Sequence, residues 1–308
     1  MDSKRTLTSP RLAAVLALGL AACNFNRIAV NTTAGVLGEA ENTTRAYFDW
    51  ESAGYAAPSG IIQLEGLHSV SPDNADLTLT LVKAYMAYTY GWVMDSYEIA
   101  YQRGDFDEAD HHKQRAYLMY SRARDLAMRV MSDRDPNFPQ MVRKDPKTLR
   151  AYLAKQFDED DLPALFWLMM SWTSAINNSP NLDELADMAS LRIVAEWIIA
   201  RNPGYEDAGA LVFLGGFEAS YPVGLGGRPE KGKAYFERAL KLTQRRNHIV
   251  LINYATIYAV AVQDRALYVS LLNEVLQAGD QGAMFRLGNK VARRRAGRAL
   301  QRVDELFY

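Results

Sequence analysis

The sequence has 308 residues, of which 49% are apolar, and its formal net charge is −1. This length and apolar content are sufficient for one large domain or two small ones with a sizeable core. The nearly balanced charge creates no global field that would select nucleic acid or an acidic membrane as a partner.

The first 22 residues predict a removable signal peptide. Lys4, Arg5 and Arg11 make the beginning basic, residues 12–20 form an uncharged apolar run, and two alanines follow. This is the arrangement of a secretory signal peptide. The apolar run is too short to cross a bilayer, which requires about 20 residues. We therefore expect the protein to be exported.

The segment Leu20-Ala21-Ala22-Cys23 resembles the bacterial lipobox, in which the cysteine after the cleavage site is acylated. Cys23 is the only cysteine, so it cannot form an internal disulfide. We expect Cys23 to carry lipid and to anchor the protein in a bilayer. The alternative is a chance cysteine near an ordinary cleavage site. Asn24 stands where an aspartate would resemble an inner-membrane retention signal, which favours the outer membrane.

The remaining chain divides into a lead-in and a helical domain. Residues 23–57 are expected to be a tether, with a short helix around residues 45–53. From Pro58 onward the apolar residues recur with a helical period, and no run of alternating β-branched residues predicts a strand. The expected fold is all-α, in a single helical-repeat domain over residues 58–308.

Several helix pairs match the tetratricopeptide repeat, a unit of two antiparallel helices with a period of about 34 residues. Its pattern places small residues where two helices approach closely. The clearest match combines Gly215 with Gly232, Phe236 and Ala239. An earlier repeat fits only if residues 95–113 are an insertion. These patterns predict a tetratricopeptide-like α-solenoid of antiparallel helix pairs.

Residues 281–307 predict a C-terminal capping helix, because solenoids need a terminal helix with a polar outer face. Its basic residues are Arg286, Lys290, Arg293, Arg294, Arg295, Arg298 and Arg302. We interpret them as a solvated face. The alternative is a patch for a partner or for anionic lipid.

The sequence contains no pattern that predicts catalysis. Residues 105–112 are rich in metal-ligand types, but the adjacent histidines His111 and His112 cannot share a helix face, so we expect a solvated helix start and no metal site. The glycine-rich segment 224–227 lacks the preceding strand that a nucleotide site requires. We expect no enzymatic activity and no cofactor.

Clustered aromatic residues are the remaining candidate site. Tyr85, Tyr88 and Trp92 are spaced on one helix face, and Trp167 and Trp172 lie close together on a later helix. Tyrosine and tryptophan combine apolar area with a polar group, which suits the binding of a ligand or a partner. The alternative is that these rings fill the core.

Four segments together resemble a known family: residues 71–74 before a tyrosine-rich helix, residues 161–167, residues 225–240 and residues 293–307. Their order and spacing resemble the T-component of tripartite ATP-independent periplasmic (TRAP) transporters, the TatT family, over residues 23–308. The resemblance implies a helical, tetratricopeptide-like lipoprotein that forms a homotrimer. It also implies association with the P-component, the periplasmic solute-binding protein, and transfers no residue role except that of Cys23.

The leading hypothesis is therefore an accessory lipoprotein of a TRAP-type uptake system that faces the periplasm. The alternative is a tetratricopeptide scaffold lipoprotein that serves outer-membrane assembly or envelope maintenance.

Overall fold

The computed structural model describes residues 29–30, 32–33, 35–36, 41–220 and 227–307. Within these ranges all regular secondary structure is helical, which confirms the predicted all-α class. The helices are α2 (Trp50–Val70), α3 (Ala75–Tyr88), η1 (Thr89–Val93), α4 (Met94–Gln102), α5 (Phe106–Arg134), α6 (Phe138–Met141), α7 (Pro146–Gln156), η2 (Glu159–Asp161), α8 (Leu162–Asn178), η3 (Leu182–Asp187), α9 (Met188–Arg201), α10 (Tyr205–Ala219), α11 (Pro229–Leu242), α12 (His248–Asn253), η5 (Tyr254–Ala259), α13 (Arg265–Gln277), η6 (Ala283–Phe285), α14 (Arg286–Gln301) and α15 (Val303–Leu306).

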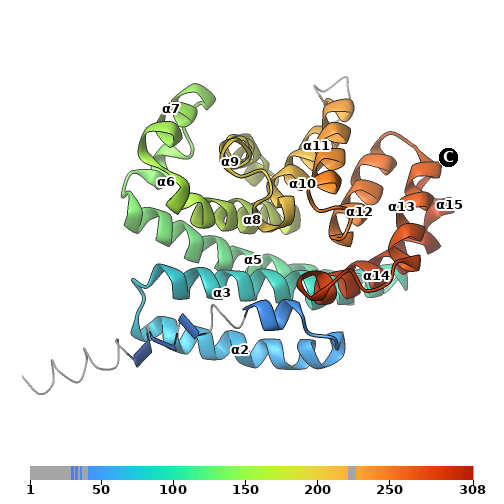
Figure 1. Ribbon diagram of the computed structural model, residues 1–308, viewed down its shortest axis with the longest axis horizontal. Helices are drawn as coiled ribbons and strands as arrows, with labels where there is room; N and C mark the ends of the chain where they lie inside the picture. Colours follow the sequence, from blue (N-terminus) through green and yellow to red (C-terminus); the bar gives the residue numbers. More distant parts are fainter. Residues whose placement is uncertain (1–28, 31, 34, 37–40, 221–226, 308) are drawn as a thin grey trace, which may run out of the picture.

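The helices form stacked layers that curl back on themselves (Figure 1). Helix α2 is an outer layer on α3, which packs on α5, which packs on α8. The chain then continues through α9, the closely packed pair α10 and α11, and α12 to α14. Buried residues form two hydrophobic clusters, one centred on α2 to α9 and the other on α10 to α14.

Helix α2 begins before the expected start of the domain. The Asp49 side chain accepts hydrogen bonds from the backbone N–H groups of Glu51 and Ser52, which caps the helix at Trp50. The expected start, Pro58, lies inside α2. Proline removes one backbone hydrogen bond from a helix, and here the helix continues through it.

The segment expected to be an insertion extends two helices. Helix α3 runs through the π-helical turn η1 into α4, and α5 has 29 residues. Residues 95–113 are the adjacent ends of α4 and α5, which are connected by a turn whose Gly104 has a φ of 76°. Helix α14 packs against this extension through ion pairs with α4.

Small residues allow α10 and α11 to approach closely. A Cβ atom on Gly232 would lie 2.8 Å from the carbonyl oxygen of Gly215, and one on Gly215 would lie 2.8 Å from the Phe236 ring. Ala239 is completely buried in the same region. The residues at these positions are those that the repeat pattern singled out, while the solenoid as a whole stays a prediction.

Candidate functional site

Two residues of the predicted aromatic face, Tyr88 and Trp92, belong to a stack of aromatic rings between helices. The rings of Tyr88 and Trp92 stack with centroids 5.9 Å apart, and Trp92 stacks on Trp50 at 5.7 Å. The stack has a guanidinium at each end: Arg115 lies 5.6 Å from the Tyr88 ring centre, and Arg294 lies 3.8 Å from that of Trp50. These contacts connect α2, α3, η1, α5 and α14, so the rings have a structural role.

Tyr85, the third residue of that face, takes part in a polar contact between α2, α3 and α5. Its hydroxyl donates a hydrogen bond of 2.8 Å to Glu65, which also accepts two hydrogen bonds from Arg122. Burial, together with the hydrogen bond to Glu65, raises the pKa of Tyr85 to about 12. The hydrogen bond from Arg122 lowers the pKa of Glu65. The phenol therefore stays protonated and donates to a carboxylate at neutral pH.

The two tryptophans of α8 have different environments. Trp172 is 1% exposed and belongs to the core, with the Arg143 guanidinium 5.1 Å from its ring centre. Trp167 is half-buried and packs edge-to-face against Phe166, and the Lys83 ammonium lies 5.7 Å from its ring centre. Trp167 is therefore the more accessible of the two.

A charged cluster lies beside Trp167 and ties the N-terminal segment to the domain. Lys83 on α3 pairs with Glu41 at 2.8 Å and lies 3.7 Å from Glu206 on α10. Arg45 pairs with Glu206 at 3.3 Å and also with Asp207. Burial raises the pKa of Glu206. Residues 41–45 are thus held by ion pairs to α3 and α10.

The π-helical turn η1 contacts both α2, near the beginning of the domain, and α14, near its end. The Trp50 indole donates to the carbonyl oxygen of Gly91 at 3.2 Å, and the Trp92 indole donates to that of Trp50 at 3.1 Å. Arg295 on α14 donates to the Tyr90 carbonyl at 3.4 Å. A π-turn alters the regular hydrogen-bond ladder of a helix, and here carbonyl groups of the turn accept bonds from two other helices.

Helix α14 docks on α4 through a network of arginines and acids. Asp95 is 2% exposed and pairs with Arg294 at 2.8 Å and with Arg298 at 2.7 Å. Glu98 pairs with Arg295 at 3.1 Å and with Arg298 at 2.7 Å. The side chains of Arg295 and Arg298 are only 13% and 15% exposed. The interpretation of these two residues as part of a solvated face is therefore wrong: Arg298 pairs with the buried Asp95, and both pair with the partly exposed Glu98.

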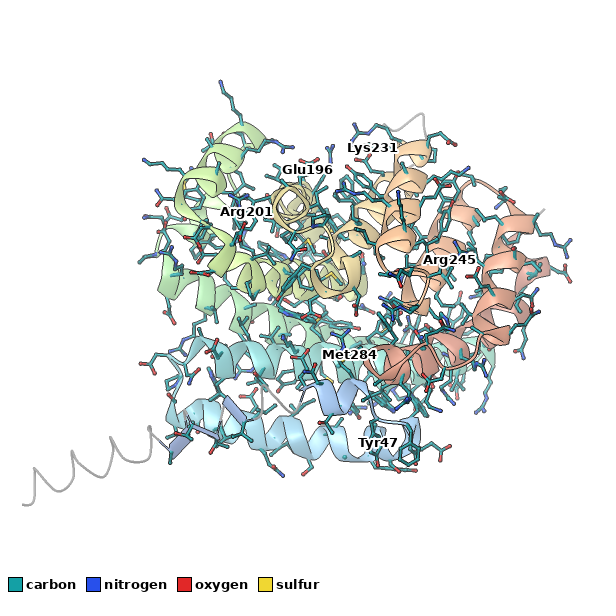
Figure 2. All side chains as sticks on the ribbon, in the orientation of Figure 1. Tyr47, Glu196, Arg201, Lys231, Arg245 and Met284 are labelled. Carbon is teal, nitrogen blue, oxygen red and sulfur yellow. The ribbon has the colours of Figure 1, made fainter. Side chains whose placement is uncertain are left out.

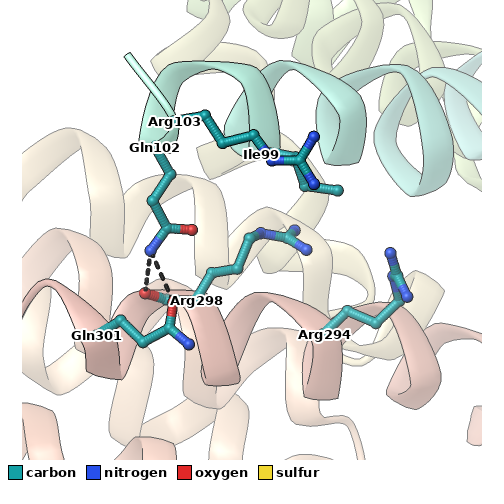
Figure 3. A pocket seen from close by; sticks show the side chains of 6 residues that line it. All are labelled: Ile99, Gln102, Arg103, Arg294, Arg298 and Gln301. Carbon is teal, nitrogen blue, oxygen red and sulfur yellow. Dashed lines mark hydrogen bonds between the residues drawn. The ribbon is translucent and has the colours of Figure 1, made fainter. Parts of the chain in front are cut away.

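Next to this network, α4 and α14 border an open surface pocket of about 480 Å³ (Figure 3). Its lining consists of Ile99, Gln102, Arg103, Arg294, Arg298 and Gln301. Gln102 donates hydrogen bonds to the side chain of Gln301 and to the carbonyl oxygen of Arg298. Arg103 forms no ion pair with any described carboxylate, and its guanidinium could receive one from outside.

Exposed aromatic residues flank Arg103 at the turn from α4 to α5. Tyr101 is 43% exposed and Phe106 is 61% exposed, and their rings meet edge-to-face at 5.7 Å. The Arg302 guanidinium lies 5.6 Å from the Tyr101 ring centre. We call Tyr101, Arg103 and Phe106 the α4–α5 turn patch. It combines the residue types that dominate binding energy at protein interfaces.

The sequence did not indicate Trp50 or Asp95. Trp50 was included in the lead-in, and Asp95 in the insertion. Asp95 and Glu98 are three positions apart, as are Arg295 and Arg298, but this spacing is common on helices and does not identify a partner helix. Nothing in the sequence placed those helices side by side.

A sequence model of the TRAP transporter T-component family matches residues 48–307. The chain belongs to this family. The match extends over the helices from α2 to α15. It therefore includes both the ion-pair network between α4 and α14 and the α4–α5 turn patch. Membership identifies the protein as an accessory component of a TRAP transporter. A search of curated proteins found no match.

Cys23 and the expected signal peptide lie outside the described residues of this T-component. Within the described ranges no helix is both long and apolar enough to cross a membrane. Attachment to a bilayer through Cys23 therefore stays a prediction.

Proposed function

We propose that this T-component is an accessory lipoprotein that is anchored through an acylated Cys23, faces the periplasm and binds the solute-binding P-component of its transporter. The observation that carries the proposal is the family match over residues 48–307. The proposal includes assembly as a homotrimer and the absence of catalysis, as the family resemblance implies, and location at the outer membrane, which Asn24 favours.

The α4–α5 turn patch is the surface that we propose for the P-component. Tyr88 and Trp92 are engaged in the interhelical stack, and Trp172 is in the core, so these rings are poorly placed to meet a partner. The exposed rings of the patch are available, and Arg103 adds a charge that is not neutralised by a described carboxylate. Trp167 remains a second candidate.

A binding titration between the two purified proteins tests this surface. Tyr101→Ala is expected to weaken the affinity for the P-component of its transporter by about 30-fold, because an interface hot spot contributes about 2 kcal/mol. Its thermal stability should change little, since the ring is exposed. Leu182→Ala is the matched control, because Leu182 is an exposed apolar residue on η3. Equal affinities for the two variants would contradict the assignment of the patch.

The anchor has a separate test. Cys23→Ser removes the thiol that would be acylated, so the variant should remain unprocessed and lack lipid. Intact mass and membrane fractionation measure both properties. A Cys23→Ser protein that matured and still pelleted with membranes would contradict the lipobox prediction.

A further inference from the structure

Beyond its first turn, which carries the exposed Glu51, the outward surface of α2 lacks the charged residues that normally solvate an exposed helix. Helix α2 has 21 residues and forms an outer layer of the molecule (Figure 1). Every exposed residue between positions 52 and 70 is uncharged. The only acid of α2 in that range, Glu65, is turned toward Tyr85 and Arg122. By contrast, the exposed residues of α5 include Asp107, Glu108 and Arg129.

Large apolar side chains project from this surface at intervals of seven residues. Phe48, just before the helix, is 67% exposed, Tyr55 is 87% exposed and Ile62 is 71% exposed. Small exposed residues such as Ala56 and Ser59 lie between them, so the three large side chains extend further from the backbone than their neighbours. Tyr55 and Ile62 share one face of α2, because a seven-residue interval corresponds to two helical turns, and Phe48 precedes the helix. We call Phe48, Tyr55 and Ile62 with the uncharged exposed residues of α2 the outer α2 face.

The chain enters the described part of the protein at this side. Val30 is buried in the large hydrophobic cluster that also contains Ile61 and Leu64 of α2, and Figure 1 draws the first described segment, in dark blue, beside α2. Figure 2 places Tyr47 at the α2 edge of the molecule, whereas Glu196 and Lys231 lie at the opposite edge. The first described residues therefore lie at the α2 side of the molecule.

The length of the chain before this point limits how far the domain can stand from an anchor. Only six residue steps separate Cys23 from Ala29. Even a fully extended chain of this length spans at most about 21 Å. If Cys23 is acylated, the α2 side of the domain must therefore lie close to the bilayer surface.

We propose that the outer α2 face rests on the lipid bilayer that holds the acylated Cys23. Tyrosine and phenylalanine are suited to the boundary between headgroups and acyl chains, and the uncharged helix surface avoids the cost of desolvating ions. The face is too small to bind a membrane firmly by itself. The anchor supplies the high local concentration of lipid that makes such a weak contact effective. This inference depends on the anchor of the proposed function but not on binding of the P-component.

A fluorescent label can report the contact directly. In the lipidated protein the Cys23 thiol is blocked by lipid, so a cysteine introduced by Ile62→Cys is the only free thiol for an environment-sensitive dye. Leu182→Cys is the matched control, because Leu182 is 76% exposed and lies on η3, away from α2. Both labelled proteins are reconstituted in phosphatidylethanolamine–phosphatidylglycerol vesicles that contain nitroxide-labelled lipid.

The expected result is that nitroxide lipid quenches the dye at position 62 at least twofold more strongly than the dye at position 182. Vesicle flotation of the same samples checks the anchor. Flotation with equal quenching at the two positions would overturn the inference and leave the anchor intact. Loss of flotation would overturn both.

The unlipidated protein of residues 24–308, with Cys23 absent, tests the other occupant of this face. Its dye at position 62 should remain exposed to water when no vesicles are present. A shielded dye together with an oligomeric mass would show that a second copy covers the face, and would overturn the proposed membrane contact.

Discussion

At the scale of single residues, two glycines determine how closely α10 and α11 approach. Gly232→Ala is expected to lower the free energy of unfolding by about 1–3 kcal/mol, because the added methyl group would overlap the Gly215 carbonyl. Gly288→Ala on α14 is the control, since no atom lies within 4 Å of its added Cβ. That change should raise the free energy of unfolding by about 0.5–1 kcal/mol. Denaturant unfolding that gave the same shift for both variants would contradict the packing.

Two buried histidines should make stability fall with acid. Burial lowers the pKa of His68 and of His248 below the ordinary value of 6.5. Below pH 6.5 the unfolded chain therefore binds protons that the folded protein does not, so stability decreases as the pH falls. The denaturant midpoint should be lower at about pH 5.5 than at about pH 7.5.

His68→Gln is expected to reduce this dependence on pH, whereas His111→Gln, at an exposed position of α5, should leave it unchanged. The comparison of how steeply stability depends on pH in the two variants separates the contribution of the buried histidine from that of the carboxylates, which also titrate in acid. A slope that is the same in the wild type and in His68→Gln would exclude His68 as a cause.

At the scale of elements, the dock of α14 on α4 depends on a buried carboxylate. Asp95→Ala should lower the free energy of unfolding by about 3 kcal/mol, because it removes the buried acid that pairs with both Arg294 and Arg298 and leaves Arg294 without an acid. Hydrogen exchange should become faster along α14. Asp304→Ala removes an exposed acid, also paired with an arginine, and should change little. Unchanged exchange in α14 of Asp95→Ala would show that other contacts hold the helix.

The stack of Trp50, Trp92 and Tyr88 predicts a division between stability and binding. Trp92→Ala should cost about 3–5 kcal/mol of stability, as expected for a large ring removed from a packed site. The folded fraction should still bind the P-component, because the α4–α5 turn patch is intact. Thermal melting and the binding titration on one sample test this. A Trp92→Ala variant with normal thermal melting and no binding would contradict this division and indicate that the aromatic face itself binds the P-component.

The elements that the sequence predicted are those whose pattern is local. The small residues Gly215, Gly232 and Ala239 lie within 25 positions of one another, so the contact pattern of one helix pair could be read directly. The partners Asp95 and Arg294 are separated by 199 positions. No periodicity within either helix reports that the chain curls back, and the basic face of α14 therefore looked solvated. Trp50 was not predicted as a member of the candidate site for the same reason, because its partner Trp92 lies on another helix.

At the scale of the whole molecule, the chain curls so that its last helices meet its first. This closure leaves three different surfaces: the α4–α5 turn patch, the outer α2 face, and charged surfaces such as the edge that carries Glu196 and Lys231 (Figure 2). A lipid anchor close to α2 would hold the outer α2 face toward the bilayer. The proposed partner would then meet the protein from the periplasm.

Affinity capture of the mature protein from its own envelope tests the central proposal most directly. Proteins that are retained at physiological salt concentration would be identified by mass spectrometry. If the protein serves a TRAP transporter as proposed, the solute-binding P-component should be the principal partner, and Tyr101→Ala should reduce its recovery. Recovery of outer-membrane assembly proteins without any solute-binding protein would contradict this account and favour an envelope scaffold.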